Sequence, residues 1–199
     1  LRYTPQIKEL ISVTDANMLV YTNKGFIYDI DLLGKSTMSL ASACAINDGY
    51  IYIGTQTGLV KIIDINTLET RVFSIDNPSH RIVHFAFTKR FAAFHKECGS
   101  DFVVGITQNG LMFVYCPMCL SHIALHNFKK KCVCVSFEKR GFVLSPKSIQ
   151  AFSNFGNHIV PEGDMGLPSD SKSVIFTVIP EHEGVQKIFI GTNTGALEI

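Results

Sequence analysis

The feature that most constrains this chain is a hairpin-like segment that returns several times along it. Residues 49–65 read GYIYIGTQTGLVKIIDI, in which an apolar run meets a polar turn and a second apolar run follows. β-Branched and aromatic residues favour a pleated surface, and Gly58 supplies the backbone freedom that a tight turn needs. The segment therefore predicts a β-hairpin.

Copies of this segment recur at a nearly regular spacing. The further copies, with their turn glycines, are 18–31 (Gly25), 102–116 (Gly110) and 187–199 (Gly195). A weaker copy at 141–154 carries Pro-Lys-Ser in place of the glycine turn. The turn glycines are separated by 33, 52 and 85 residues, and the weaker copy divides the last interval, so the spacing averages 42.5 residues. A period of about 40–45 residues is typical of the blades of a β-propeller.

Most copies are also preceded by another strand-like run and followed by a short one. Four strands in each unit match a radial sheet that its neighbours cover on both faces. We therefore predict an all-β chain, a β-propeller domain or fragment over 1–199. Its five blade-like units are expected at 11–40, 41–77, 80–128, 131–162 and 172–199. A closed propeller usually has about six to eight blades, so we expect the chain to be part of a larger propeller.

The repeat resembles the WD-repeat family where a strand enters a glycine turn and the next strand closes on an acidic residue. Asp31 and Asp64 occupy the place of that family's aspartate, but Ile30 and Ile63 stand where the family has tryptophan. The chain contains no tryptophan. His80 is similar in position to the family's histidine in front of the innermost strand. The resemblance implies a divergent WD-like propeller in which the family's His–Ser/Thr–Trp–Asp hydrogen-bond network is not assured.

A second resemblance concerns the end of the chain. The weaker copy, the sequence Asn154-Phe155-Gly156-Asn157 and the last copy together look like the final blades of propellers in BEACH-domain proteins. Propellers of vesicle-coat and tethering subunits, and of cell-cycle and RNA-processing scaffolds, look similar. The resemblance implies a protein–protein interaction scaffold within a large assembly, with vesicle trafficking as one expected setting.

Charge and hydropathy narrow the classes of partner. The net charge is +1, so no global field attracts nucleic acid. The run Lys129-Lys130-Lys131 is interpreted as a solvated turn rather than a phosphate-binding patch. No apolar stretch approaches the roughly 20 residues that span a bilayer. With no signal peptide evident, we expect a cytoplasmic protein that binds other proteins and no small-molecule substrate.

Four of the six cysteines form the one ligand-like cluster. Cys116 and Cys119 have the C-x-x-C spacing of a zinc knuckle, whereas Cys132 and Cys134 have the poorer C-x-C spacing. Zinc binding is the weaker alternative. The favoured interpretation is that Cys132 and Cys134 share a core-facing side of a strand as reduced thiols. We therefore predict no metal and no cofactor.

We find no catalytic constellation, and the chain is predicted not to be an enzyme. The alternatives are an enzyme of the hydrolase or quinoprotein type on a propeller scaffold, and a nucleic-acid-associated propeller subunit. Two surface loops are expected, at 90–100 and at 163–173, and partner binding is assigned to them. The predicted anchors of the first loop are Arg90, Phe91, Phe94 and His95, for which packing of the loop onto the propeller is the alternative role.

Overall fold

The computed structural model is built from β-strands throughout the part of the chain that it describes. That part comprises residues 2–4, 9–13, 17–22, 25–31, 41–67, 69–75, 80–89, 101–137, 140–167, 173–182, 185–195 and 197–198, with side chains described between 41 and 167 and between 188 and 195. These residues form nineteen strands in five antiparallel sheets. None of them forms a helix that is long and apolar enough to cross a membrane. The prediction of an all-β chain is confirmed.

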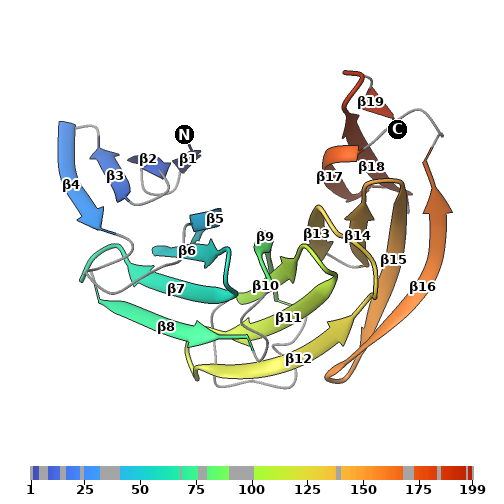
Figure 1. Ribbon diagram of the computed structural model, residues 1–199, viewed down its shortest axis with the longest axis horizontal. Coiled ribbons are helices and arrows are strands. Elements are labelled where there is room, and N and C mark those ends of the chain that lie inside the picture. Colours follow the sequence, from blue (N-terminus) through green and yellow to red (C-terminus); the bar gives the residue numbers. More distant parts are fainter. Residues whose placement is uncertain are drawn as a thin grey trace. The chain divides into compact units, whose positions relative to one another are not determined.

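The described residues of the first compact unit, Leu1–Ile82, contain two four-stranded sheets. Sheet A consists of β1 (Arg2–Thr4), β2 (Glu9–Val13), β3 (Asn17–Thr22) and β4 (Gly25–Asp31). Sheet B consists of β5 (Ala41–Asn47), β6 (Tyr50–Thr55), β7 (Leu59–Asp64) and β8 (Thr70–Ser74). In both sheets, strands that follow one another in the chain lie side by side (Figure 1).

The second compact unit, Val83–Ile199, contains three further sheets. Sheet C consists of β9 (Ile82–Thr88), β10 (Phe102–Thr107), β11 (Leu111–Cys116) and β12 (Ser121–Asn127). Sheet D consists of β13 (Cys134–Phe137), β14 (Gly141–Ser145), β15 (Ser148–Phe155) and β16 (His158–Gly166). Sheet E consists of β17 (Ser173–His182), β18 (Val185–Thr192) and β19 (Leu197–Glu198). Each sheet again follows the order of the chain (Figure 1).

The predicted hairpins agree with the pairs β6–β7, β10–β11 and β14–β15, the last of which lacks a turn glycine. The prediction of a surface loop at 163–173 is wrong for residues 163–166, because β16 continues to Gly166. Ile149 pairs with Met165 and Ser148 pairs with Gly166, so the glycine-rich stretch remains part of an edge strand. The division of the chain into the blades of a single propeller stays a prediction.

Sheets C and D share a hydrophobic core. Phe102, Val104 and Ile106 of β10 lie in it together with Val143 of β14 and Phe152 of β15. All of these side chains are fully buried. Because burial of one such side chain contributes about 1.5–3 kcal/mol, this core holds the two sheets against each other.

The opposite face of sheet D is also covered. Phe142 and Leu144 of β14 lie in a second buried cluster with Ile149 of β15 and Ile190 of β18. Successive residues of a strand point to opposite faces, and in β14 both faces are apolar. Sheet D is therefore covered by apolar neighbours on both faces, which is the arrangement that a propeller blade requires.

Two glycines make room for aromatic rings inside these sheets. Gly105 of β10 pairs with Phe113 of β11, and a Cβ at Gly105 would lie 2.0 Å from the Phe113 ring. Gly141 of β14 pairs with Phe152 of β15, and a Cβ there would lie 2.1 Å from the Phe152 ring. In each pair the ring lies over the glycine of the neighbouring strand.

Candidate functional site

The candidate site is built on the turns between the second and third strands of sheets C and D. In sheet C this turn runs from Thr107 to Gly110. The Gly110 N–H donates to the Thr107 carbonyl oxygen (3.0 Å), and the Leu111 N–H donates to Thr107 Oγ1 (3.0 Å). Gly110 has a φ of 89°, which glycine adopts without steric cost. A buried threonine hydroxyl and one glycine thus close the turn.

The same closure recurs in other sheets. In sheet B the Leu59 N–H donates to Thr55 Oγ1 (2.9 Å), and Gly58 has a φ of 81°. In sheet E the Gly195 N–H donates to the Thr192 carbonyl oxygen (3.1 Å). Thr55 and Thr192 are buried, as Thr107 is. The hydroxyls of Thr55 and Thr107 accept from backbone N–H groups, whereas Thr192 Oγ1 lies 2.7 Å from Thr194 Oγ1.

Sheet D closes its turn with serine. The Ser148 N–H donates to Ser145 Oγ (3.0 Å), and Ser145 Oγ donates to the Ser148 carbonyl oxygen (2.9 Å). The two serine hydroxyls lie 2.8 Å apart. Pro146 and Lys147 occupy the tip between them, and Lys147 is exposed.

The connection from sheet C to sheet D rests on the sheet C turn. The Phe128 N–H donates to the Gly110 carbonyl oxygen (3.0 Å), and the Cys132 N–H donates to the Gln108 carbonyl oxygen (2.9 Å). A Cβ at Gly110 would lie 2.4 Å from the Lys130 carbonyl oxygen. Glycine is therefore required there for the close approach as well as for the turn.

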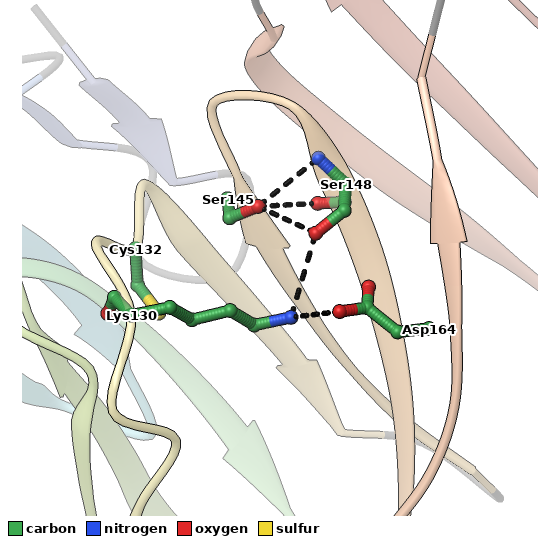
Figure 2. Close-up of polar contacts among 5 residues, drawn as sticks. All are labelled: Lys130, Cys132, Ser145, Ser148 and Asp164. Carbon is green, nitrogen blue, oxygen red and sulfur yellow. Dashed lines mark hydrogen bonds and ion pairs between the residues drawn. The ribbon is translucent and has the colours of Figure 1, made fainter.

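Lys130 ties this connection to the outer strands of sheet D. Its Nζ donates to Asp164 Oδ2 of β16 (2.8 Å) and to Ser148 Oγ of β15 (3.4 Å). Figure 2 shows the lysine side chain extending from the connection across to these two strands. The Lys130 side chain is 22% exposed and that of Asp164 is 46% exposed, so water screens the ion pair in part.

The two neighbours of Lys130 point to solvent. Lys129 and Lys131 are both exposed, as expected for a solvated turn, whereas Lys130 is not. Lys129 has a φ of 55°, and its N–H donates to Asn127 Oδ1 (2.8 Å). The side-chain amide of Asn127 thereby stabilises the turn that presents these lysines.

The structure does not bring the four predicted cysteines together. Cys116 ends β11 and Cys119 lies in the following turn, whereas the Cys132 N–H is bonded to Gln108 at the other end of β11. A strand of that length spans about 17 Å, and Zn–S bonds are about 2.3 Å long. Within the described residues, no group of three or more His, Cys, Asp or Glu side chains is placed to hold a metal.

Cys132 and Cys134 do not share a face, contrary to the expectation. Cys132 lies in the core between sheets C and D with Val135, and Cys134 lies in the cluster between sheets D and E beside Val133. The reason is that β13 begins only at Cys134, so strand alternation does not extend to Cys132. Burial raises the pKa of the Cys132 thiol to about 12, and the charge of Lys130 opposes this rise only in part.

The predicted partner-binding residues Arg90, Phe91, Phe94 and His95 lie outside the described residues. Their role stays a prediction. His80 lies just before β9, as expected, and its Nδ1 is buried without a hydrogen-bond partner among the described residues. The WD-type hydrogen-bond network is therefore not formed at this nitrogen within that part of the chain.

Sequence reasoning missed the threonine of the turns, although its signal is present. Thr22, Thr55, Thr107 and Thr192 each stand three positions before a turn glycine. Alignment of the copies on the preceding threonine would have found the pattern. The link between Lys130 and Asp164 has no such signal, because 34 residues separate the two.

The architecture is similar to that of a known propeller. The match to the crystal structure of Saccharomyces cerevisiae Sqt1, a WD40 β-propeller, has a TM-score of 0.74 at 10% sequence identity. It covers 96% of this chain and 55% of the Sqt1 chain, so the chain spans about half the length of that structure. In total, 759 chains of solved structures match, so the architecture alone does not select a function.

No protein-family model matches the sequence, and no curated protein matches it. At this level of identity the likeness to Sqt1 is a likeness of fold. The four-stranded sheets in chain order, the apolar cover on both faces of sheet D and the match to Sqt1 agree with one another. The chain therefore has an all-β, WD-like β-propeller fold.

Proposed function

We propose that this chain is a non-enzymatic protein–protein interaction module that acts as a scaffold within a multiprotein assembly. The observation that carries the proposal is the cover on both faces of sheet D, where apolar clusters lie on either side. A sheet buried in this way offers a partner its edges and its turns, not its faces. The turns and the edge strand are consequently the parts of the sheet that a partner meets.

The turns of sheets C and D are suited to that role because they are rigid. Buried hydroxyls of Thr107 and Ser145 close them, and backbone hydrogen bonds seat the connection at Phe128 and Cys132. A surface that is ordered before binding loses little conformational entropy when a partner docks. Rigid turns on a stacked-sheet framework therefore favour recognition over chemistry.

The finer parts of the proposal are the cytoplasm as its location and membrane trafficking as its setting. They rest on the resemblance carried by residues 141–157 and 187–199. We expect the partners to be other subunits of the assembly.

Affinity purification of the full-length protein that contains this chain tests the proposal, with cross-linking and mass spectrometry of what is recovered. We expect at least one partner at near-equal molar amounts, cross-linked to lysines of the turns such as Lys131 and Lys147. A variant with Lys131→Gln and Lys147→Gln should recover less of the partner. The control, with the exposed Arg71 and Lys89 outside these turns replaced by Gln, should retain it. Recovery of the protein alone, or equal loss of the partner with the control, would overturn the proposal.

A further inference from the structure

Three exposed lysines lie in the two segments that meet where sheet C is joined to sheet D. Lys129 and Lys131 flank Lys130 in the connection, and Lys147 lies at the tip of the sheet D turn. The link between the two turns is direct, because Lys130 Nζ lies 3.4 Å from Ser148 Oγ and Ser148 follows Lys147 in the chain. We call Lys129, Lys131 and Lys147 the lysine rim.

Two acidic side chains of β16, the outer strand of sheet D, are already engaged. Asp164 accepts from Lys130 Nζ (2.8 Å), and Glu162 of the same strand is paired with Arg140. No ion pair to Lys129 or Lys131 occurs among the described side chains. These two lysines therefore present positive charge that the neighbouring strand does not neutralise.

The rim is also held in place. The N–H groups of Phe128 and Cys132 donate to the sheet C turn, and the Lys129 N–H donates to Asn127 Oδ1. On the sheet D side, the Leu167 N–H donates to the Lys147 carbonyl oxygen (2.8 Å). The backbone under all three ammonium groups is thus fixed before any partner arrives, which favours binding.

We propose that the lysine rim docks an acidic segment of a partner protein. The proposal deepens the proposed function, on which it rests, by naming the chemistry of the partner. Charge complementarity carries the argument, because the two cations of the connection, with a third lysine on the adjacent turn, match a short run of Asp or Glu.

A protein segment fits this surface better than a nucleic acid does. The whole chain has a net charge of +1, and the rim is confined to two turns. Sequence-independent binding of nucleic acid needs a wider basic face that neutralises many phosphates. A small group of lysines on a nearly neutral protein instead favours the binding of a short acidic protein segment.

Fluorescence anisotropy with the full-length protein tests the proposal. The probe is a fluorescein-labelled peptide of alternating Glu and Ser, and its control has Gln in place of every Glu. The variant is Lys129→Gln with Lys131→Gln and Lys147→Gln. The matched control carries Arg71→Gln, Arg81→Gln and Lys89→Gln, which remove the same charge from exposed positions elsewhere. Circular dichroism establishes that both variants are folded.

We expect the Glu peptide to bind, and the rim variant to weaken binding about tenfold, since each exposed ion pair contributes only modestly. The control variant should change the affinity less than about twofold, and binding should weaken as salt is raised. Equal binding of the Gln peptide, equal loss in the control variant, or tighter binding of a single-stranded RNA of the same charge would overturn the proposal. If the full-length protein retains a partner in affinity purification but does not bind the Glu peptide, the acidic chemistry is wrong and the interaction module stands.

Discussion

The turn between the second and third strands of sheet C and the corresponding turn of sheet D perform one task with different residues. In sheet C, Thr107 supplies the hydroxyl acceptor and Gly110 supplies the left-handed backbone. In sheet D, Ser145 supplies the hydroxyl, and Pro146 and Lys147 occupy the tip without any glycine. What the two turns share is a buried hydroxyl at the end of the second strand.

The difference lies in what rests on each turn. The Lys130 carbonyl oxygen comes so close to Gly110 that a Cβ would lie 2.4 Å away. In sheet D, the Leu167 N–H reaches the Lys147 carbonyl oxygen at an ordinary distance of 2.8 Å. The comparison indicates that glycine is needed at position 110 because the following chain comes too close for a Cβ, and that the hydroxyl is needed in both turns.

The largest expected effect is a difference in alkylation rate between two thiols, Cys132 in the connection from sheet C to sheet D and Cys119 in the turn after β11. Because burial raises the pKa of Cys132 from 9.0 to about 12, its thiolate fraction at pH 8 is about a thousandfold below that of an unperturbed thiol. Cys119 is exposed and should be alkylated first. Iodoacetamide labelling followed by peptide mass spectrometry measures both rates. If Cys132 in the folded Cys119→Ser variant were labelled as fast as Cys119 is in the unsubstituted protein, the connection would not be seated on the sheet C turn.

The next effect concerns Gly110. Gly110→Ala forces a left-handed alanine, at about 1–2 kcal/mol, and displaces the Lys130 carbonyl, at about 1–3 kcal/mol more. Gly156→Ala is the control, because Gly156 has a φ of 62° but a Cβ added there would meet nothing within 4 Å. Urea unfolding followed by circular dichroism suits a chain without tryptophan. Equal destabilisation by both substitutions would contradict the close approach.

A smaller effect tests the shared hydroxyl. Thr107→Val leaves the Leu111 N–H without its acceptor and is expected to lower the free energy of unfolding by about 1–2 kcal/mol. Ser145→Ala removes the acceptor of the Ser148 N–H and should cost a similar amount. Thr107→Ser keeps the hydroxyl and serves as the control. If Thr107→Val were neutral while Thr107→Ser destabilised, the methyl group rather than the hydroxyl would be the important part.

The smallest effect concerns the ion pair between the two regions. Lys130→Met is expected to lower stability by about 0–1 kcal/mol, since a partly exposed pair is screened by water. A double-mutant cycle with Asp164→Asn isolates the interaction of the two side chains. The coupling should decrease in 1 M salt, where screening acts over about 3 Å. A coupling that salt does not change would show that Lys130 acts by packing its methylene groups.

The sequence allows the hairpins to be predicted but not the contacts between sheets. Apolar runs around a turn mark β6–β7 and β10–β11, because residues of a sheet buried on both faces are apolar without interruption. The strand β16 is not predictable over 163–166 because glycine and aspartate are poor strand formers, and its pairing with β15 overrides that preference.

The candidate site was only partly predictable from the sequence, because some of its contacts join segments that are far apart in the chain. A run of three lysines is expected to be solvated, and Lys129 and Lys131 are exposed. The pairing of Lys130 instead depends on Asp164, which lies 34 residues away in β16. The faces of Cys132 and Cys134 depend on where β13 begins, because only a strand that started two residues earlier would place both cysteines on one face. The buried threonine of the turns was readable, but only by comparing the copies with each other.

The rings of Phe113 and Phe152 lie over Gly105 and Gly141, where a Cβ would come within 2.0 and 2.1 Å of ring carbon atoms. In each glycine–phenylalanine pair, one residue cannot be substituted without a change in the other. A chain of the same architecture that replaces the glycine must shrink the ring across from it, and one that shrinks the ring gains room for a larger neighbour. Among relatives of this protein, these two positions should therefore change together or not at all.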